Sequence, residues 1–168
     1  MNLPYTEQAK RVVRSYGKIP APNYPNYTQD EVWDIYYHLF QDAYHLKDWI
    51  LNDDDVKIGQ DKIEKNKILN EFIEKNVNMK LLQSIVTNMK HLKAERNHIK
   101  HREILLTWSE GDMGPSPAIS YSISEFDLNC EEDLKMIHPR RLAVKVLVSW
   151  NKFFSENKLE GNFEMESI

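Results

Sequence analysis

The chain has 168 residues, of which 41% are hydrophobic and 29% charged, and its formal net charge is −4. This composition excludes a disordered chain, and the length fits one domain that buries its own core. The mild negative charge excludes a protein that binds nucleic acid with its whole surface, but it leaves room for a local cationic site.

The compartment and the lack of a membrane span are predicted from features that the sequence does not contain. The single cysteine, Cys130, has no partner for an internal disulfide, which suits a reducing cytoplasm. The first residues lack the apolar core of a secretory signal, and no run approaches the roughly 18 to 20 apolar residues of a membrane span. We therefore expect a cytoplasmic protein that does not enter a membrane.

The first thirty residues predict a short helix and an arm. Val12, Val13 and Tyr16 form the apolar side of a helix within residues 1–19. Residues 19–28 contain three prolines and two tyrosines, so an extended or turn-like path is expected. We interpret 1–30 as an N-terminal helix and a Pro/Tyr-rich arm, not as a second domain.

Apolar residues at helical spacing predict four longer helices. The first begins near Thr28, where Glu31 completes a capping box, and ends in the acidic segment 52–55. The others cover roughly 61–76, 79–97 and 139–157, the last with Pro139 in its first turn. The inward residues expected for the helix at 61–76 are Ile63, Ile68, Phe72 and Ile73.

The period changes to two between residues 103 and 125, which predicts a β-hairpin. Residues 104–108 form one strand, and in the second strand Ile119, Tyr121 and Ile123 alternate with serines. The fold class expected is therefore mainly α (α+β), a four- to five-helix bundle with one β-hairpin inserted before the last helix. The bundle spans 31–159, with the hairpin at 103–125, and 160–168 is expected to be a flexible tail.

One side of the helix that starts near residue 28 is polar, and spacings of three and four put these residues on one face. They are His38, Gln41, Asp42, His45 and Asp48. His38, Asp42 and His45 suit a metal ion if His91 or water completes the ligand set. The other interpretation is a hydrated face, which we favour because a helix must be polar somewhere. No cofactor is therefore expected.

A second polar group belongs to the helix at 79–97. If this helix lies antiparallel to the one that starts near residue 28, His45 and Asp48 approach Asn88 and His91. Such a cluster is either a supporting polar network in the core or part of a site. We favour the network, because a histidine in such a cluster is usually a satisfied hydrogen-bonding partner.

The stretch from Lys90 to Arg102, KHLKAERNHIKHR, is the most distinctive in the chain. It holds five Lys or Arg residues against one acid, and three of the six histidines. A local cationic patch with imidazoles is a plausible place for RNA phosphates to bind. The substrate-binding residues predicted there are Lys90, His91, Lys93, His98, Lys100 and Arg102.

Within this stretch, Arg96, Asn97 and His101 spell R-N-x-x-x-H. A histidine can take the proton of a ribose 2′-hydroxyl or protonate the leaving 5′-oxygen, and an arginine can hold the scissile phosphate. Neither step needs a metal. On an unbroken helix Arg96 and His101 would lie about 140° apart, so they converge only at a helix end, at a bend or with a partner chain.

This spacing resembles the R-x(4–6)-H signature of the HEPN superfamily, including the polar residue directly after the arginine. The resemblance implies a helical bundle and a metal-independent endoribonuclease of a toxin–antitoxin or phage-defence system, with its active site at a homodimer interface. It also implies that Arg96 and His101 are the catalytic pair and that Asn97 is auxiliary.

The chain contains two further segments, residues 44–49 and 88–92, that are similar to segments in a group of small uncharacterised bacterial and phage proteins. This similarity implies no activity. The alternative to a ribonuclease is a non-enzymatic interaction or regulatory module of a defence-related system. Such a module would bind a protein partner through the edge of the hairpin or through the Pro/Tyr-rich arm.

Overall fold

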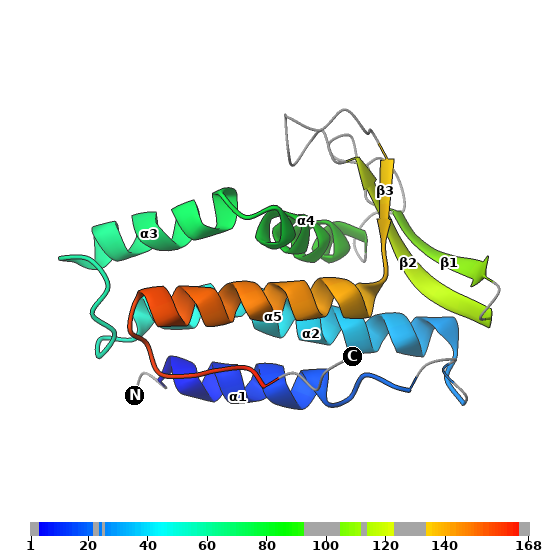
Figure 1. The fold of residues 1–168 in the computed structure, drawn as a ribbon, viewed down its shortest axis with the longest axis horizontal. Helices are drawn as coiled ribbons and strands as arrows, with labels where there is room; N and C mark the ends of the chain where they lie inside the picture. The colour runs from blue at the N-terminus through cyan, green and yellow to red at the C-terminus, as the bar shows by residue number, and fades with distance from the viewer. Residues whose placement is uncertain are drawn as a thin grey trace.

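Five helices and a three-stranded antiparallel sheet make up the described part of the chain (Figure 1). The structure is a computed structural model, and it describes residues 4–21, 24, 26–92, 105–111, 114–122 and 134–164. The helices are α1 (Tyr5–Tyr16), α2 (Gln29–Asn52), α3 (Lys62–Glu74), α4 (Val77–Leu92) and α5 (Pro139–Glu156). The strands are β1 (Leu105–Gly111), β2 (Gly114–Ser122) and β3 (Leu134–Ile137). The mainly α fold predicted from the sequence is confirmed.

Helix α2 is the centre of the bundle, because it contacts each of the other four helices. Figure 1 shows α1 on one side of the α2–α5 pair and α3 with α4 on the other. The interior between them is aromatic: Trp150 and Tyr36 are fully buried, and Phe40 is nearly so. The indole N–H of Trp150 donates to the Ala43 carbonyl at 3.0 Å, so this large side chain is also satisfied as a donor.

The predicted helix starts are confirmed by their caps. The amide of Glu31 donates to Thr28 Oγ1 at 3.3 Å, and the amide of Thr28 donates to Glu31 Oε2 at 2.7 Å. This reciprocal pair is the capping box expected from the sequence. Helix α5 begins at Pro139 as predicted, but the side chain that caps it is the preceding His138.

The inward face of α3 agrees with the prediction at three residues and differs at one. Ile73 is buried, and Ile68 and Phe72 are partly buried against the core. Ile63 is 82% exposed, and the buried residues are Lys65, Leu69 and Ile73. These three follow one another at intervals of four and form a single stripe, whereas Ile63 lies on the opposite side of the helix. A lysine in the stripe concealed the pattern: its amine reaches the Asp53 carbonyl at 2.9 Å.

The predicted hairpin is present as β1 and β2, and Ile119 and Tyr121 are buried as expected. A third strand, β3, pairs with β2 and places Ile119 opposite Ile137. It was missed because four residues are too few to display a period of two. In the register of β1 and β2, Trp108 lies opposite Pro117.

Both ends of the described chain are packed. A flexible tail was expected over 160–168, but Phe163 is 4% exposed, and its amide donates to Asn151 Oδ1 at 2.7 Å. The hydroxyl of Tyr5 donates to the Glu160 carbonyl at 2.7 Å, which ties the start of α1 to the same segment. The apolar Phe163 side chain therefore anchors residues 160–164, whereas 165–168 lie outside the described residues.

Candidate functional site

The proposed catalytic residues Arg96, Asn97 and His101 lie outside the described residues. So do the predicted substrate-binding residues Lys93, His98, Lys100 and Arg102. Lys90, His91 and Asn88 belong to α4, where the structure describes their backbone but not their side chains. Their predicted roles stay predictions.

The structure does fix both sides of the segment that carries the motif. Upstream, α4 is anchored in the core by Leu82 and Ile85, which are 0% and 1% exposed. Downstream, β1 is held by its antiparallel pairing with β2. Figure 1 shows α4 directed towards the side of the bundle where the sheet and the start of α5 lie. Residues 93–104 therefore join two well-anchored elements.

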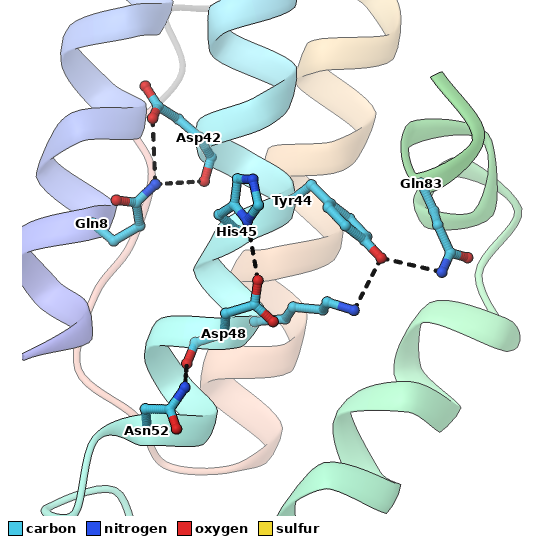
Figure 2. Close-up of polar contacts among 8 residues, drawn as sticks. Gln8, Asp42, Tyr44, His45, Asp48, Asn52 and Gln83 are labelled. Atoms are coloured by element: carbon cyan, nitrogen blue, oxygen red, sulfur yellow. Dashed lines mark hydrogen bonds and ion pairs between the residues drawn. The ribbon is translucent and has the colours of Figure 1, made fainter. Parts of the chain in front are cut away.

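The polar stripe of α2 is partly a contact between helices (Figure 2). Asp42 accepts a 2.6 Å hydrogen bond from Ser15 Oγ. Gln8 Nε2 donates to the Asp42 carbonyl at 2.9 Å and lies 3.4 Å from its carboxylate. A polar residue that the sequence placed on a hydrated face therefore joins α1 to α2.

The metal alternative required His38, Asp42 and His45 to share one ion. Instead His38 Nδ1 lies 2.7 Å from the Asp34 carbonyl, and Asp42 is engaged by α1. His45 Nδ1 lies 3.0 Å from Asp48 Oδ2. In the described ranges no group of three His, Cys, Asp or Glu residues is placed to hold a metal ion. Each of these α2 side chains therefore has a partner of its own.

Of the predicted polar network, the structure describes the side chains of His45 and Asp48, which contact each other. Their side chains are 47% and 48% exposed. Among the described side chains, Tyr44 of α2 reaches α4, because its hydroxyl accepts from Gln83 Nε2 at 3.1 Å (Figure 2). The described part of the network is a surface pair.

A different polar cluster lies where β3 meets α5. His138 Nδ1 accepts the amide N–H of Arg140 at 3.1 Å, and this bond caps α5. On the other side of the ring, Nε2 lies 3.1 Å from the Tyr24 hydroxyl, which in turn lies 3.2 Å from the Tyr36 hydroxyl. Because Nδ1 accepts, the neutral ring carries its proton on Nε2 and donates it to Tyr24.

Burial governs the electrostatics of this cluster. It lowers the pKa of His138, and the nearby Arg140 guanidinium lowers it further, so the neutral imidazole is favoured. Burial also raises the pKa values of Tyr24 and Tyr36, which keeps both phenols protonated. At neutral pH the cluster is uncharged and hydrogen-bonded, which suits a structural junction better than acid–base chemistry.

Sequence reasoning missed this cluster, because its members are far apart in the chain. Tyr24 and His138 are 114 residues apart. Histidine is also not among the residues preferred at a helix N-cap, so Pro139 marked the helix start without marking its cap. The available signal was weak: a tyrosine in a proline-rich arm and a histidine before Pro139.

Two surface hollows of similar size lie elsewhere. A groove of about 480 Å³ between α3 and α5 is lined by Phe72 and Phe153, with the ion pair of Lys75 and Glu71 at its rim. A hollow of about 500 Å³ between α1 and α2 is lined by Lys18, His38 and several acids. Neither brings together an arginine and a histidine, which is the pair that the sequence argument requires.

No family model, no curated protein and no solved structure matches the chain. Its function is therefore inferred from its own residues. No helix in the described ranges has the length and apolar character required to cross a bilayer.

Proposed function

We propose that this protein is a HEPN-like, metal-independent endoribonuclease that acts as a homodimer, with a role as a toxin or antiphage effector. The observation that carries the proposal is the R-N-x-x-x-H spacing of Arg96, Asn97 and His101 within a cationic stretch of a chain that is acidic overall. The substrate class is single-stranded or looped RNA, in which the ribose and phosphate are accessible.

The proposed reaction balances without a cofactor. The ribose 2′-oxygen attacks phosphorus, and the bond between phosphorus and the 5′-oxygen breaks. The proton lost by the 2′-hydroxyl passes to the leaving 5′-oxygen, with His101 as its carrier. Arg96 holds the phosphate and neutralises the charge that develops on it, and Asn97 orients one of the two. The products are a 2′,3′-cyclic phosphate and a 5′-hydroxyl.

The described structure supports the proposal in two ways. The fold is mainly helical, as the resemblance implies, and α4, which precedes the motif in the sequence, is anchored in the core. Further cations lie at the start of α5: Arg141 is exposed, and Arg140 carries a buried Nε with no hydrogen-bond partner among the residues described. Cations on that side of the bundle favour the approach of a polyanion.

The test is RNA cleavage by purified protein in the presence of EDTA. We expect Arg96→Ala and His101→Ala each to lower the cleavage rate by about 100-fold or more, because each removes a group acting on the reacting atoms. Matched controls are Arg14→Ala on α1 and His38→Ala on α2, which remove an exposed arginine and an exposed histidine far from the motif in sequence. Cleavage unchanged in both motif variants would remove the proposal.

The dimer is tested by mixing the two motif variants after confirming the oligomeric state by light scattering. If Arg96 of one chain works with His101 of the other, a mixed dimer contains one intact site, and mixing restores activity. If both residues act within one chain, mixed dimers stay inactive. A monomer at concentrations that support cleavage would contradict the homodimer part of the proposal.

The second candidate, an interaction or regulatory module, is favoured by the sheet. Strand β1 lies at one end of the order β1-β2-β3, so its outer edge pairs with no described strand. Such an edge can accept a strand from a partner protein. We expect Thr107→Lys, at an exposed position of β1, to weaken capture of that partner without affecting stability. A partner bound equally well by both proteins would count against this surface.

A further inference from the structure

Tyr24 joins the N-terminal arm to three separate elements. Its hydroxyl lies 3.2 Å from that of Tyr36 on α2 and 3.1 Å from Nε2 of His138, just before α5. Its ring centroid lies 5.8 Å from that of Trp108 on β1. The side chain is 7% exposed, although it comes from a proline-rich segment.

The backbone at Tyr24 needs these contacts. Its φ is 44°, in the left-handed region, and the same is true of Asn26 at 73°. A bulky residue rarely adopts this conformation, which is strained and persists only where the surrounding contacts impose it. The arm is therefore held in its conformation by the side-chain contacts of Tyr24, and losing them would release the backbone.

His138 is the titratable member of this junction. Its hydrogen bond at Nδ1 requires the neutral form, whereas an Nε2–H is present in the neutral and in the protonated ring. Nδ1 must be free of a proton to accept the Arg140 amide, and Nε2 must carry one to donate to Tyr24. The groups that face the ring are Tyr24 from the arm, Tyr36 from α2 and Arg140 from α5. In the described ranges no carboxylate contacts the imidazole, so a positive charge there has no counterion.

We propose that His138 is a pH-sensitive latch. In its neutral form it holds Tyr24 of the arm, and with it the backbone hydrogen bonds of Tyr24 and Tyr27, against the bundle, and it releases them on protonation. A proton on Nδ1 removes the cap of α5 and places a positive charge at a helix N-terminus, beside Arg140. Both effects are relieved when the imidazole turns out into water. That movement takes away the partner of the Tyr24 hydroxyl.

The sign of the pH effect follows from linkage. The pKa of His138 is lowered from its ordinary value of 6.5 in the folded protein, so the released and unfolded states take up the proton first. The latch is therefore complete above about pH 6.5 and weakens as the pH falls below that value. Its effect is confined to the arm and its contacts, and it does not depend on the ribonuclease proposal.

The test is amide hydrogen exchange of Tyr24 and Tyr27 in the full chain at pH 7.5 and pH 5.5, corrected for the intrinsic effect of pH on exchange. Their N–H groups donate to the Ala21 and Tyr24 carbonyls, at 3.2 Å each. We expect protection of these amides to fall at pH 5.5 by up to about tenfold, because pH 5.5 lies one unit below the ordinary pKa of 6.5 that the released imidazole has. Protection of α2 and α5 beyond its first turn should stay unchanged. Equal protection of the arm at both pH values would overturn the proposal.

His138→Asn is the matched variant, because asparagine caps a helix well but does not titrate in this range. Its arm should show the same protection at both pH values, whereas His38→Asn, at an exposed histidine of α2, should retain the pH dependence of the natural chain. A pH dependence that persists in full in His138→Asn would also overturn the latch.

A second measurement covers the case in which His138→Asn does not fold. In the natural chain, NMR signals of the Tyr24 ring should shift with the same midpoint as the His138 imidazole. Tyr24→Phe should leave the arm exchanging faster already at pH 7.5. The proposal would be contradicted if the signals of the two rings shifted with different midpoints. It would also be contradicted if the arm amides of Tyr24→Phe were as protected from exchange as those of the natural chain.

Discussion

Two histidines of this fold have different surroundings, although each lies beside a side chain of α2. His45 is itself on α2, contacts Asp48 one turn further along and is 47% exposed in its side chain. His138 bonds with both ring nitrogens, to the arm on one side and to the first turn of α5 on the other. A contact within one helix is local, whereas the one at His138 holds separate parts of the chain together.

The two environments differ in what they can contribute to stability. An exposed polar pair at a spacing of three on a helix is worth a few tenths of a kcal/mol, because water solvates both partners well in its absence. Removing a buried hydrogen-bonded group lowers the free energy of unfolding by more, because its partner is left buried without a hydrogen bond. Substitutions at the two sites should therefore differ in size and in their dependence on pH and salt.

Tyr36→Ala should have the largest effect. Tyr36 is fully buried and packs against the Phe40 and His138 rings, with centroids 6.1 Å and 6.3 Å away. Removing a buried aromatic ring costs about 3–5 kcal/mol, from lost burial and the cavity left behind. Chemical denaturation measures this cost. Tyr44→Ala, at a half-buried tyrosine of the same helix, is the comparison and should cost clearly less; equal losses would contradict the assignment of Tyr36 to the core.

His138→Ala should come next. It removes the side-chain cap of α5, worth about 0.5–2 kcal/mol, and leaves Tyr24 without its partner, which costs about 1–3 kcal/mol more. Because the two losses share one side chain, we expect a total of about 2–3 kcal/mol at pH 7.5, measured by urea denaturation.

The matched His138→Asn variant should recover the part that belongs to the cap. The difference between the alanine and natural proteins should also shrink at pH 5.5, because the natural imidazole itself is then partly protonated. A loss in His138→Ala that is the same at both pH values would contradict a neutral imidazole as the stabilising form.

The sequence was a good guide where the structure is determined locally. The capping box of Thr28 and Glu31, the start of α5 at Pro139 and the alternation through Ile119 and Tyr121 each depend on residues within a few positions of one another. Where a lysine replaced an apolar residue in the stripe of α3, the same reasoning placed Ile63 inward, although it is 82% exposed.

The polar clusters were less predictable because their partners are distant. Asp42 was assigned to a hydrated face, since nothing in α2 indicates that Ser15 of α1 lies 2.6 Å from its carboxylate. The junction of Tyr24, Tyr36 and His138 joins three segments whose proximity depends on how the whole bundle packs. The motif at 96–101 was visible as a spacing, but convergence of its side chains is a tertiary property that spacing alone does not determine.

Tyr24→Phe should have a moderate effect, because the ring and its packing against Trp108 are retained. The variant loses the hydroxyl that lies between His138 and Tyr36, and we expect a loss of about 1 kcal/mol in the free energy of unfolding. A thermal or urea melt at pH 7.5 measures it. The double variant with His138→Ala should lose less than the sum of the two single losses, since both remove the same bond. Strict additivity would show that the two side chains do not interact.

Asp48→Ala should have the smallest effect. The carboxylate lies 3.0 Å from His45 Nδ1, but both side chains are nearly half exposed, so water replaces the lost partner on either side. We expect a change within about 0.5 kcal/mol, which becomes smaller in 1 M salt because the ions screen an exposed pair. His45→Ala should behave in the same way. A loss above 1 kcal/mol that persists in high salt would show that this pair is shielded from water, as a core network with α4 requires, and the contrast with His138 would then disappear.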